Sequence, residues 1–363
     1  MGKRIVIAGG GTGGHIFPAI AIANALRQQD PSVDILFIGA NGKMEMEKVP
    51  QAGYRIEGLD IAGFNRKSIL KNIGLPFKLI NSFLRVRKLM AAFKPDAVIG
   101  VGGYSTYPVL RYAQNKGVPT FIHEANSFAG KSNILLGKRA TRIYVATSGM
   151  EKFFPEERIM ITGNPVRKNI VQQQLSRQDA LNHFGLQADK TTVLVIGGSL
   201  GAKSINDVIA AHITDFGQLQ LQLIWQTGKH QADAYRDRGK PFENIWVDTF
   251  ITEMDKAYAA ADLVISRAGA MSVTEICVAG LPAIFVPYPL AAEDHQTVNA
   301  MHLVNNNAAL LVKDEQAPQQ LFATMVQLAK SEEKKAELRK NIKPFAITNA
   351  DEVIAKDIMK YLV

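Results

Sequence analysis

Residues Ile5–Leu26 read IVIAGGGTGGHIFPAIAIANAL, where an apolar run is followed by glycines and then by a helical pattern. Gly9, Gly11 and Gly14 have the spacing GxGxxG directly after the strand-like run. This order of strand, glycine turn and helix is typical of a βαβ unit that binds the phosphates of a ligand at the helix N-terminus. It predicts a Rossmann-like parallel sheet at the start of the chain.

The same alternation of short β-branched runs, glycines and helical patterns continues along the chain and predicts an α/β fold with two doubly wound parallel-sheet domains. The expected strands are Arg4–Ala8, Val33–Ile38, Ala97–Val101, Thr120–His123, Arg142–Ala146 and Ile159–Thr162 in the first domain, and Thr192–Ile196, Gln222–Gln226, Asn244–Val247, Asp262–Ser266, Ala283–Val286 and Ala309–Val312 in the second. The expected domains are residues 1–163, onto which a C-terminal helix within 344–363 packs back, and residues 164–343.

Length and composition limit the class of protein. A chain of 363 residues has room for two domains, and 47% hydrophobic with 21% charged residues is ordinary for a folded protein. Its single cysteine, Cys277, excludes an internal disulfide framework and a multi-cysteine metal site, which fits a reducing compartment. The net charge of +9 favours anionic partners, namely nucleic acid, an acidic lipid surface or phosphorylated small molecules.

The first glycine turn does not fit a dinucleotide site. Such a site needs an acidic residue at the end of the second strand, whereas Asp34 lies at the start of Val33–Ile38. His15 follows the glycines directly and has two interpretations. It is either a polar capping residue or a general base, since an imidazole pKa near 6.5 suits proton transfer at neutral pH.

Further glycine turns follow other predicted strands: Gly102-Gly103-Tyr104, Gly197-Gly198-Ser199-Leu200-Gly201 and Arg267-Ala268-Gly269. The last precedes a helix with Glu275, which either stabilises the helix dipole or accepts hydrogen bonds from a ribose. His123-Glu124-Ala125-Asn126 ends another strand. Because ligands bind at the carboxyl ends of strands in open α/β sheets, these turns predict a site in a crevice facing both domains.

Seven segments carry a resemblance to a known family: GGTGGHIFPA, VIGVGGYSTYP, HEANSFAG, GNPVR, VIGGSLGA, RAGAMSVTEICVAGLPAIFVP and EDHQTVNA, in this order over nearly the whole chain. With them the sequence resembles the MurG family of peptidoglycan glycosyltransferases. These enzymes transfer N-acetylglucosamine from UDP-N-acetylglucosamine to the muramyl 4-hydroxyl of lipid I, with inversion at the sugar carbon, and form lipid II. The resemblance implies a GT-B fold.

It also implies residue roles. Contacts to the donor are expected from Thr12, Gly13, Gly14, Asn126, Arg167, Ser199, Ile251, Ala270, Met271, Ser272, Val273, Thr274, Glu275 and Gln296, with Gly103 and Tyr104 on the acceptor side. Glu275 is expected to bind the ribose, and either His15 or Glu124 to be the base. Leu200 and Ala125 stand where the family segments have glutamine, so their effect on contacts near the phosphates and the acceptor stays open.

The resemblance further implies peptidoglycan synthesis and cell wall biogenesis, with consequences for cell shape, cell division and the cell cycle. The implied location is the cytoplasmic face of the bacterial inner membrane, with other cell-wall synthesis proteins as candidate partners. Since no Asp-x-Asp segment is present, we expect neither a cofactor nor an obligatory protein-held metal. No nucleic-acid recognition motif accompanies the basic charge. A UDP-N-acetylglucosamine 2-epimerase or a glycolipid synthase of the same fold is the alternative function.

Residues 61–95 combine many basic side chains with apolar ones and contain no Asp or Glu. A segment of this kind can place charge at anionic lipid headgroups and apolar side chains beneath them. The alternative is a basic helix that packs its apolar side on the domain core. The predicted membrane contacts are Arg66, Lys67, Lys71, Arg85 and Lys88.

Overall fold

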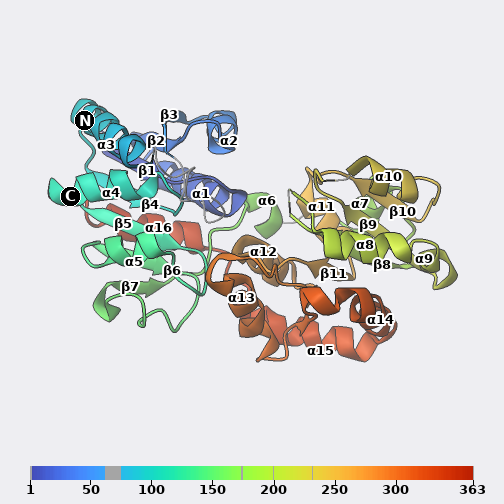
Figure 1. Cartoon of the computed structure of the whole chain (residues 1–363). Coiled ribbons are helices and arrows are strands. Elements are labelled where there is room, and N and C mark those ends of the chain that lie inside the picture. The colour runs from blue at the N-terminus through green and yellow to red at the C-terminus, as the bar shows by residue number, and fades with distance from the viewer. Residues whose placement is uncertain (1, 62–74, 173–174, 199, 231, 363) are drawn as a thin grey trace. The chain divides into compact units, whose positions relative to one another are not determined.

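The computed structural model describes residues 2–61, 75–172, 175–198, 200–230 and 232–362. It divides into two units, each with one parallel sheet and helices around it (Figure 1). Unit 1 is Met1–Arg167 together with Asn349–Val363, and unit 2 is Lys168–Thr348. The predicted α/β class with two doubly wound sheets is confirmed.

Unit 1 has a seven-stranded sheet in the order β3-β2-β1-β4-β5-β6-β7, with every neighbouring pair parallel. The strands are β1 Arg4–Ala8, β2 Asp34–Ala40, β3 Arg55–Leu59, β4 Ala97–Gly100, β5 Thr120–Glu124, β6 Arg142–Val145 and β7 Ile159–Ile161. The order reverses between β1 and β4, which is where such sheets bind ligands. The edge strand β3 was not among the predicted strands, because Arg55, Glu57 and Gly58 interrupt its apolar run.

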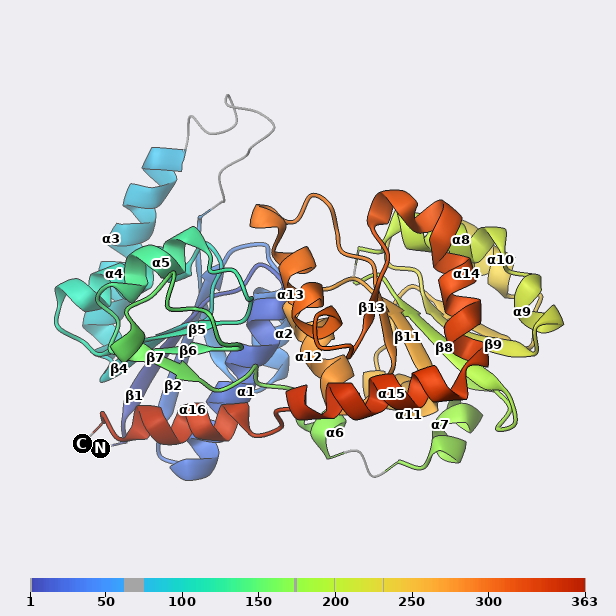
Figure 2. The same ribbon diagram turned by 90° about the horizontal axis from the view of Figure 1, so that it is seen from below.

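The helices of unit 1 cover both faces of this sheet. They are α1 Gly13–Gln29, α2 Glu45–Gln51, α3 Leu75–Phe93, α4 Thr106–Asn115, α5 Lys131–Gly137 and α16 Ala350–Met359, with a 3-10 turn at Glu156–Arg158. Ile5 and Ile7 pack with α1 and α16, whereas Val6 and Ala8 pack with α3, α4 and α5. A strand buried on both faces needs a continuous apolar sequence, which explains the run at the start of the chain. Figure 2 shows α16 alongside α1.

Unit 2 has a six-stranded parallel sheet in the order β10-β9-β8-β11-β12-β13. Its strands are β8 Thr191–Ile196, β9 Leu221–Gln226, β10 Ile245–Asp248, β11 Leu263–Ser266, β12 Ala283–Phe285 and β13 Leu310–Leu311. Its α-helices are α6 Lys168–Val171, α7 Arg177–Phe184, α8 Lys203–Ala211, α9 Asp215–Gln218, α10 Ala232–Gly239, α11 Met254–Ala260, α12 Ala270–Ala279, α13 His295–Val304, α14 Ala317–Lys330 and α15 Glu332–Ile342. The strand order reverses between β8 and β11.

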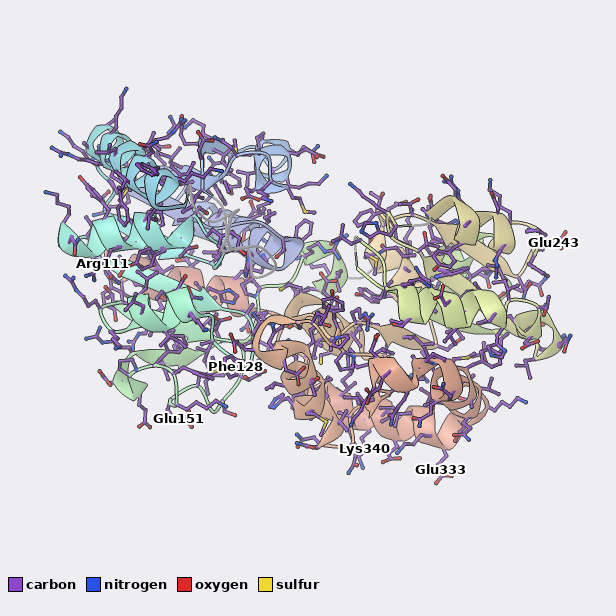
Figure 3. All side chains as sticks on the ribbon, in the orientation of Figure 1. Arg111, Phe128, Glu151, Glu243, Glu333 and Lys340 are labelled. Atoms are coloured by element: carbon purple, nitrogen blue, oxygen red, sulfur yellow. The ribbon has the colours of Figure 1, made fainter. Side chains whose placement is uncertain are left out.

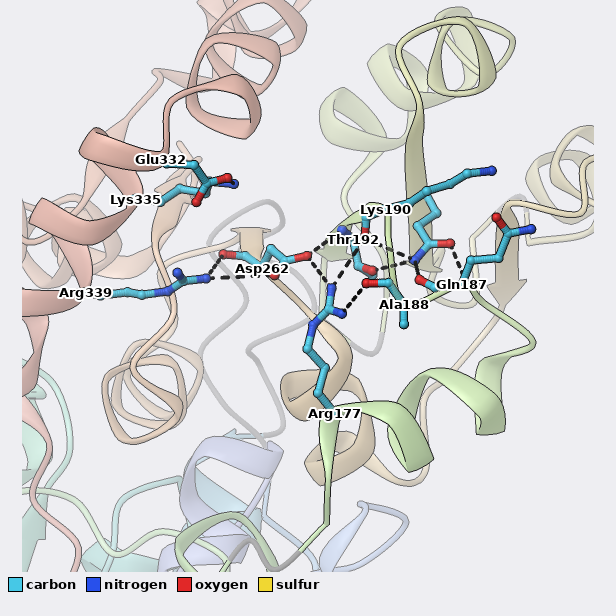
Figure 4. Close-up of polar contacts among 10 residues, drawn as sticks. Arg177, Gln187, Ala188, Lys190, Thr192, Asp262, Glu332, Lys335 and Arg339 are labelled. Carbon is cyan, nitrogen blue, oxygen red and sulfur yellow. Dashed lines mark hydrogen bonds and ion pairs between the residues drawn. The ribbon is translucent and has the colours of Figure 1, made fainter.

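Asp262 joins helices to the amino ends of the strands in unit 2 (Figure 4). Its Oδ2 accepts hydrogen bonds from Arg177 Nη2 at 2.7 Å and from the Thr192 backbone N–H at 2.8 Å. Arg339 Nη2 donates to the Asp262 carbonyl at 3.2 Å. This network lies at the opposite ends of β8 and β11 from the glycine turns, so it supports the sheet and leaves the ligand edge open.

Candidate functional site

The turns after β1 and β4 pack closely against each other at the reversal point of unit 1. The Gly10 N–H donates to the Gly102 carbonyl at 3.2 Å, and Thr106 Oγ1 donates to the same carbonyl at 2.9 Å. A Cβ atom on Gly103 would lie 2.4 Å from the Gly10 oxygen. Only glycine permits this close approach of two backbones, which explains why both predicted turns contain glycine.

His15 lies in the first turn of α1 with one ring nitrogen committed to the backbone. Its Nδ1 is 3.0 Å from the carbonyl oxygen of Gly10. Because a carbonyl only accepts hydrogen bonds, Nδ1 carries a proton, so in the neutral ring Nε2 has the lone pair. The half-buried ring lies against Gly102, where a Cβ would be 2.8 Å from Nε2. This geometry fits the general-base interpretation of His15.

Glu124 has no acceptor position left for a substrate proton. Its Oε1 accepts from the backbone N–H and the side-chain amide of Asn126, at 3.1 and 3.2 Å. Its Oε2 accepts from the Gly130 N–H at 3.0 Å and from Asn133 Nδ2 at 2.9 Å. Since a carboxylate has about four lone-pair sites, donors from this loop and from α5 use all of them. The geometry therefore favours His15 over Glu124 as the base.

The loop after β5 is fixed from both of its sides. Phe128, labelled in Figure 3, packs edge to face on Phe153 with ring centroids 4.7 Å apart. Asn164 Nδ2 donates to the carbonyl of Ala125 at 3.1 Å. The predicted donor contact Asn126 is thus held in an ordered loop, through its bonds to Glu124.

His123 is buried beside His15, with 1% of its surface exposed. Burial, with a smaller contribution from the neighbouring His15, lowers the pKa of His123 to about 4. The ring lies near Gly163 and Asn164, but neither ring nitrogen makes a hydrogen bond of good geometry with a described residue. His123 is therefore neutral at neutral pH.

The buried His123 predicts an acid-sensitive fold. In the unfolded chain its pKa is near 6.5, so between pH 6.5 and 4 the unfolded state binds a proton that the folded state does not. Stability should fall as the pH falls through this window, by about 3 kcal/mol for this residue. Chemical denaturation at pH 7 and pH 4.5 measures it. The His123→Gln variant should lose less stability than the parent over this interval, and equal losses would contradict the prediction.

The other predicted contacts in unit 1 lie around the same turn. Thr12 is exposed and precedes α1, where no acidic side chain in the first turn competes with an anion for the N–H groups of Gly13 and Gly14. The Arg167 guanidinium lies over the Phe17 ring, 5.3 Å from its centroid. Tyr104 is 56% exposed, next to the close approach at Gly103.

The second glycine turn is held by Gln226, which the sequence analysis did not identify. This buried side chain donates from Nε2 to the Gly198 carbonyl at 3.3 Å and accepts from the Ile251 N–H at 3.0 Å. A Cβ atom on Gly228 would lie 2.0 Å from the Gly201 nitrogen, so two loops meet there as in unit 1. The Ile251 side chain is buried, and its N–H is already bonded.

Arg267, at the third turn, lines a pocket of about 410 Å³ beside the second turn. Its guanidinium donates to the Val286 carbonyl at 2.9 Å and to Ser204 Oγ at 3.1 Å, and pairs with Asp314. It also lies 5.5 Å from the centre of the Tyr288 ring. These contacts join the turns after β8 and β11 into one polar surface at the carboxyl-terminal edge of the unit 2 sheet.

Helix α12 begins at this edge. Gly269 precedes the helix, no side chain in the described part of the chain caps it, and its first turn has no acidic residue. The segment Ala270–Glu275 follows, in which Ala270, Ser272, Val273 and Thr274 are half-buried and Met271 and Glu275 are buried. Tyr258 donates its hydroxyl to Glu275 Oε2 at 3.2 Å. A helix N-terminus of this kind attracts a diphosphate.

Gln296 lies at the start of α13 and accepts the Tyr288 N–H with Oε1 at 3.0 Å. Before it, Glu293 and Asp294 have φ values of 54° and 51°, a left-handed conformation that is strained for non-glycine residues. Strain of this kind gathers at ligand sites, so the EDHQ segment is a further candidate contact. Among the predicted site residues, Ser199, Arg66, Lys67 and Lys71 lie outside the described residues.

Helix α3 carries the remaining predicted membrane residues. Arg85 pairs with Glu57 at 3.1 Å, and Lys88 is exposed. The two sides of this helix differ in exposure, which was not predicted from the sequence. Val86 and Met90 are buried, whereas Phe77, Ile80 and Leu84 are 71%, 58% and 60% exposed.

Within the described ranges, no helix is long and apolar enough to cross a membrane. The same residues contain no group of three or more His, Cys, Asp or Glu that could hold a metal ion.

Family models match both units. The model of the glycosyltransferase family 28 N-terminal domain matches residues 5–145, and that of the C-terminal domain matches residues 192–358. The chain belongs to glycosyltransferase family 28. The N-terminal family domain thus contains His15 and the turns after β1 and β4, and the C-terminal one contains α12 and the turns after β8 and β11. The chain is a hexosyltransferase.

Relatives in this glycosyltransferase family match over nearly the full length. The UDP-N-acetylglucosamine--N-acetylmuramyl-(pentapeptide) pyrophosphoryl-undecaprenol N-acetylglucosamine transferase of Phocaeicola vulgatus is 48% identical over 98% of this chain and 96% of its own. The enzyme of that name from Flavobacterium psychrophilum is 46% identical over 98% and 97%. The predicted family is confirmed.

Solved structures agree in fold. The crystal structure of Acinetobacter baumannii MurG is similar with a TM-score of 0.77 and 32% identity, over 99% of each chain. A UDP-GlcNAc 2-epimerase from Neisseria meningitidis, bound to UDP-GlcNAc, has a TM-score of 0.69 over 99% of this chain and 100% of its own. Its identity of 13% shows a shared fold alone.

Proposed function

We infer that this family 28 enzyme transfers N-acetylglucosamine from UDP-N-acetylglucosamine to the muramyl 4-hydroxyl of lipid I and forms lipid II. The observation that carries this function is the 48% identity to an enzyme named for this transfer, over 98% of the chain. Cell wall biogenesis follows from the reaction. Roles in cell shape and division, and contacts with other cell-wall synthesis proteins, are further parts of the proposal.

His15 acts as the base in the proposed mechanism. Nε2 removes the proton of the muramyl 4-hydroxyl while its oxygen attacks C1 of N-acetylglucosamine from the face opposite the UDP. The bond from C1 to the diphosphate oxygen breaks with its electron pair, so UDP leaves and the anomeric carbon inverts. The Gly10 carbonyl, 3.0 Å from Nδ1, fits this role because it holds the ring with Nε2 as acceptor.

Unit 2 stabilises the leaving diphosphate by fixed dipoles. Backbone N–H groups at the turn after β8 and at the start of α12 act in this role, since preorganised donors cost no reorganisation during the reaction. Glu275 binds the ribose hydroxyls. We propose that the reaction uses no cofactor and no protein-held metal, so that chelation leaves the basal transfer intact.

A transfer assay tests this function directly. The purified protein, with radiolabelled UDP-N-acetylglucosamine and lipid I, is expected to form lipid II. A parallel reaction with a chelator is expected to form the same amount of product. An epimerase would instead convert the donor without any lipid acceptor. Donor conversion that ignores lipid I, or no product with lipid I present, contradicts the proposed function.

We propose that α3 docks the enzyme on an anionic membrane. Phe77, Ile80 and Leu84 lie at helical spacing on its exposed side, and Arg87 and Lys88 continue that side one turn further. Apolar side chains beside basic ones suit a surface with anionic headgroups, where each basic residue adds about 1 kcal/mol. Because the polyprenyl chain of lipid I stays in the membrane, the enzyme must contact the membrane surface to reach this substrate.

Changing this surface should separate membrane binding from donor binding. The variant Ile80→Ser/Leu84→Ser/Arg87→Glu/Lys88→Glu is expected to lose most of its binding to anionic vesicles, while UDP affinity stays near the parent value. Co-sedimentation with anionic and neutral vesicles at two salt concentrations measures it, because charge attraction weakens with salt. Lys330→Glu/Lys340→Glu, on α14 and α15, is the matched control. Equal vesicle binding by parent and folded variant would rule out this docking surface.

A further inference from the structure

Glu45 is a buried carboxylate that reaches into the first glycine turn from α2. Only 1% of its surface is exposed. A Cβ atom on Gly10 would lie 2.2 Å from its Oε1, and one on Gly39 would lie 2.5 Å from its Cγ. The Glu45 side chain therefore occupies the space that glycine leaves at both positions.

Two backbone N–H groups donate to this carboxylate, one to each oxygen. Its Oε2 accepts from Gly11 at 2.8 Å, and its Oε1 accepts from Ala40 at 3.0 Å. Ala40 is the last residue of β2, and Gly11 lies in the turn after β1. Burying a charge is costly unless hydrogen bonds compensate it, and bonds to an ionised acceptor are the stronger kind. Glu45 thus links the ends of two adjacent strands.

One peptide group connects Glu45 to His15. The N–H of Gly11 and the C=O of Gly10 belong to the same planar unit and point in opposite directions in its trans form. Glu45 holds the N–H, and the C=O accepts from His15 Nδ1 at 3.0 Å. Glycines on both sides, with φ of 146° and 91°, leave this peptide free to rotate when nothing holds it.

We propose that Glu45 is a positioning residue for the transfer reaction. By holding the N–H end of the Gly10–Gly11 peptide, it aims the carbonyl at His15 Nδ1 and keeps the proton there. Nε2 then remains the acceptor for the proton of the substrate hydroxyl. This inference rests on the proposed function, in which His15 is the base. Glu45 itself touches no substrate.

The His15 tautomer is the direct test. Nitrogen NMR of ¹⁵N-histidine-labelled protein, with His15 assigned from the His15→Gln variant, should show protonated Nδ1 in the parent. In Glu45→Ala the His15 signals should move toward the Nε2–H form that free neutral imidazole favours. Glu45→Asp, whose shorter side chain cannot reach both N–H groups, should shift them in the same direction. Glu47→Gln, an exposed position on the same helix, should match the parent.

Kinetics supply the second measurement. We expect kcat to fall about 10–100-fold in Glu45→Ala, the scale of a small misplacement of a catalytic group. UDP affinity by calorimetry should fall less than kcat, because the proposed ribose contact Glu275 and the diphosphate donors at the start of α12 lie in unit 2. If Glu45→Ala does not fold, the same tautomer and kinetic measurements on Glu45→Asp test the inference. A parent-like His15 tautomer in a folded variant overturns the inference. If the parent forms no lipid II, the proposed function fails, while a tautomer shift still supports the link from Glu45 to His15.

Discussion

The His15→Ala variant is expected to turn over about 10²–10⁴-fold more slowly than the parent, the usual effect of losing a general base. His15 Nε2 is the atom that the structure leaves available, because Nδ1 is committed to the Gly10 carbonyl. UDP affinity should change little. Single-turnover transfer to lipid I measures the chemical step, and calorimetry measures UDP binding.

Two further variants sharpen this prediction. His15→Gln keeps a side chain that can bond to the Gly10 carbonyl but cannot take up the proton, so its turnover should be as low as that of His15→Ala. His212→Ala, a half-exposed histidine in unit 2 that bonds to Asp215, is the matched control and should transfer at the parent rate. Turnover within a few-fold of the parent in both His15 variants would exclude His15 as the base.

The Glu275→Ala variant is expected to bind UDP-N-acetylglucosamine about 10–100-fold more weakly. Hydrogen bonds to a charged group contribute roughly 1.5–3 kcal/mol, and the ribose would lose its carboxylate acceptor. Glu275 is buried near the start of α12, with Tyr258 donating to one oxygen. Isothermal calorimetry with UDP-N-acetylglucosamine and with UDP gives the two affinities.

The controls for Glu275 separate binding from support of the fold. Tyr258→Phe removes the internal hydrogen bond and keeps the carboxylate, so it should cost less donor affinity than Glu275→Ala. Glu333→Gln, on the exposed side of α15, should leave the affinity unchanged. Parent-like donor affinity in a folded Glu275→Ala variant would show that this carboxylate does not bind the ribose.

The strands of both sheets other than β3 could be predicted, because their residue types follow local rules. Parallel strands buried on two faces need continuous apolar runs, and the runs at Ile5 and Val193 both become central strands. The edge strand β3 escaped prediction because an edge needs fewer apolar residues, and the charged Arg55 is exposed and Glu57 half-buried there. Only its parallel pairing with β2 in the folded protein identifies this segment as a strand.

The sequence by itself determined the family, the fold class and the glycine turns, since these depend on residue types at short spacing. The tertiary structure decided which side chains hold those turns. Glu45 lies 34 residues from Gly11 and Gln226 lies 28 from Gly198, and no local pattern marks either pair. It also favoured His15 over Glu124, because the fold of each loop decides which oxygens of Glu124 and which ring nitrogen of His15 already have a hydrogen bond. A buried polar group acquires its role from the donors that folding places around it.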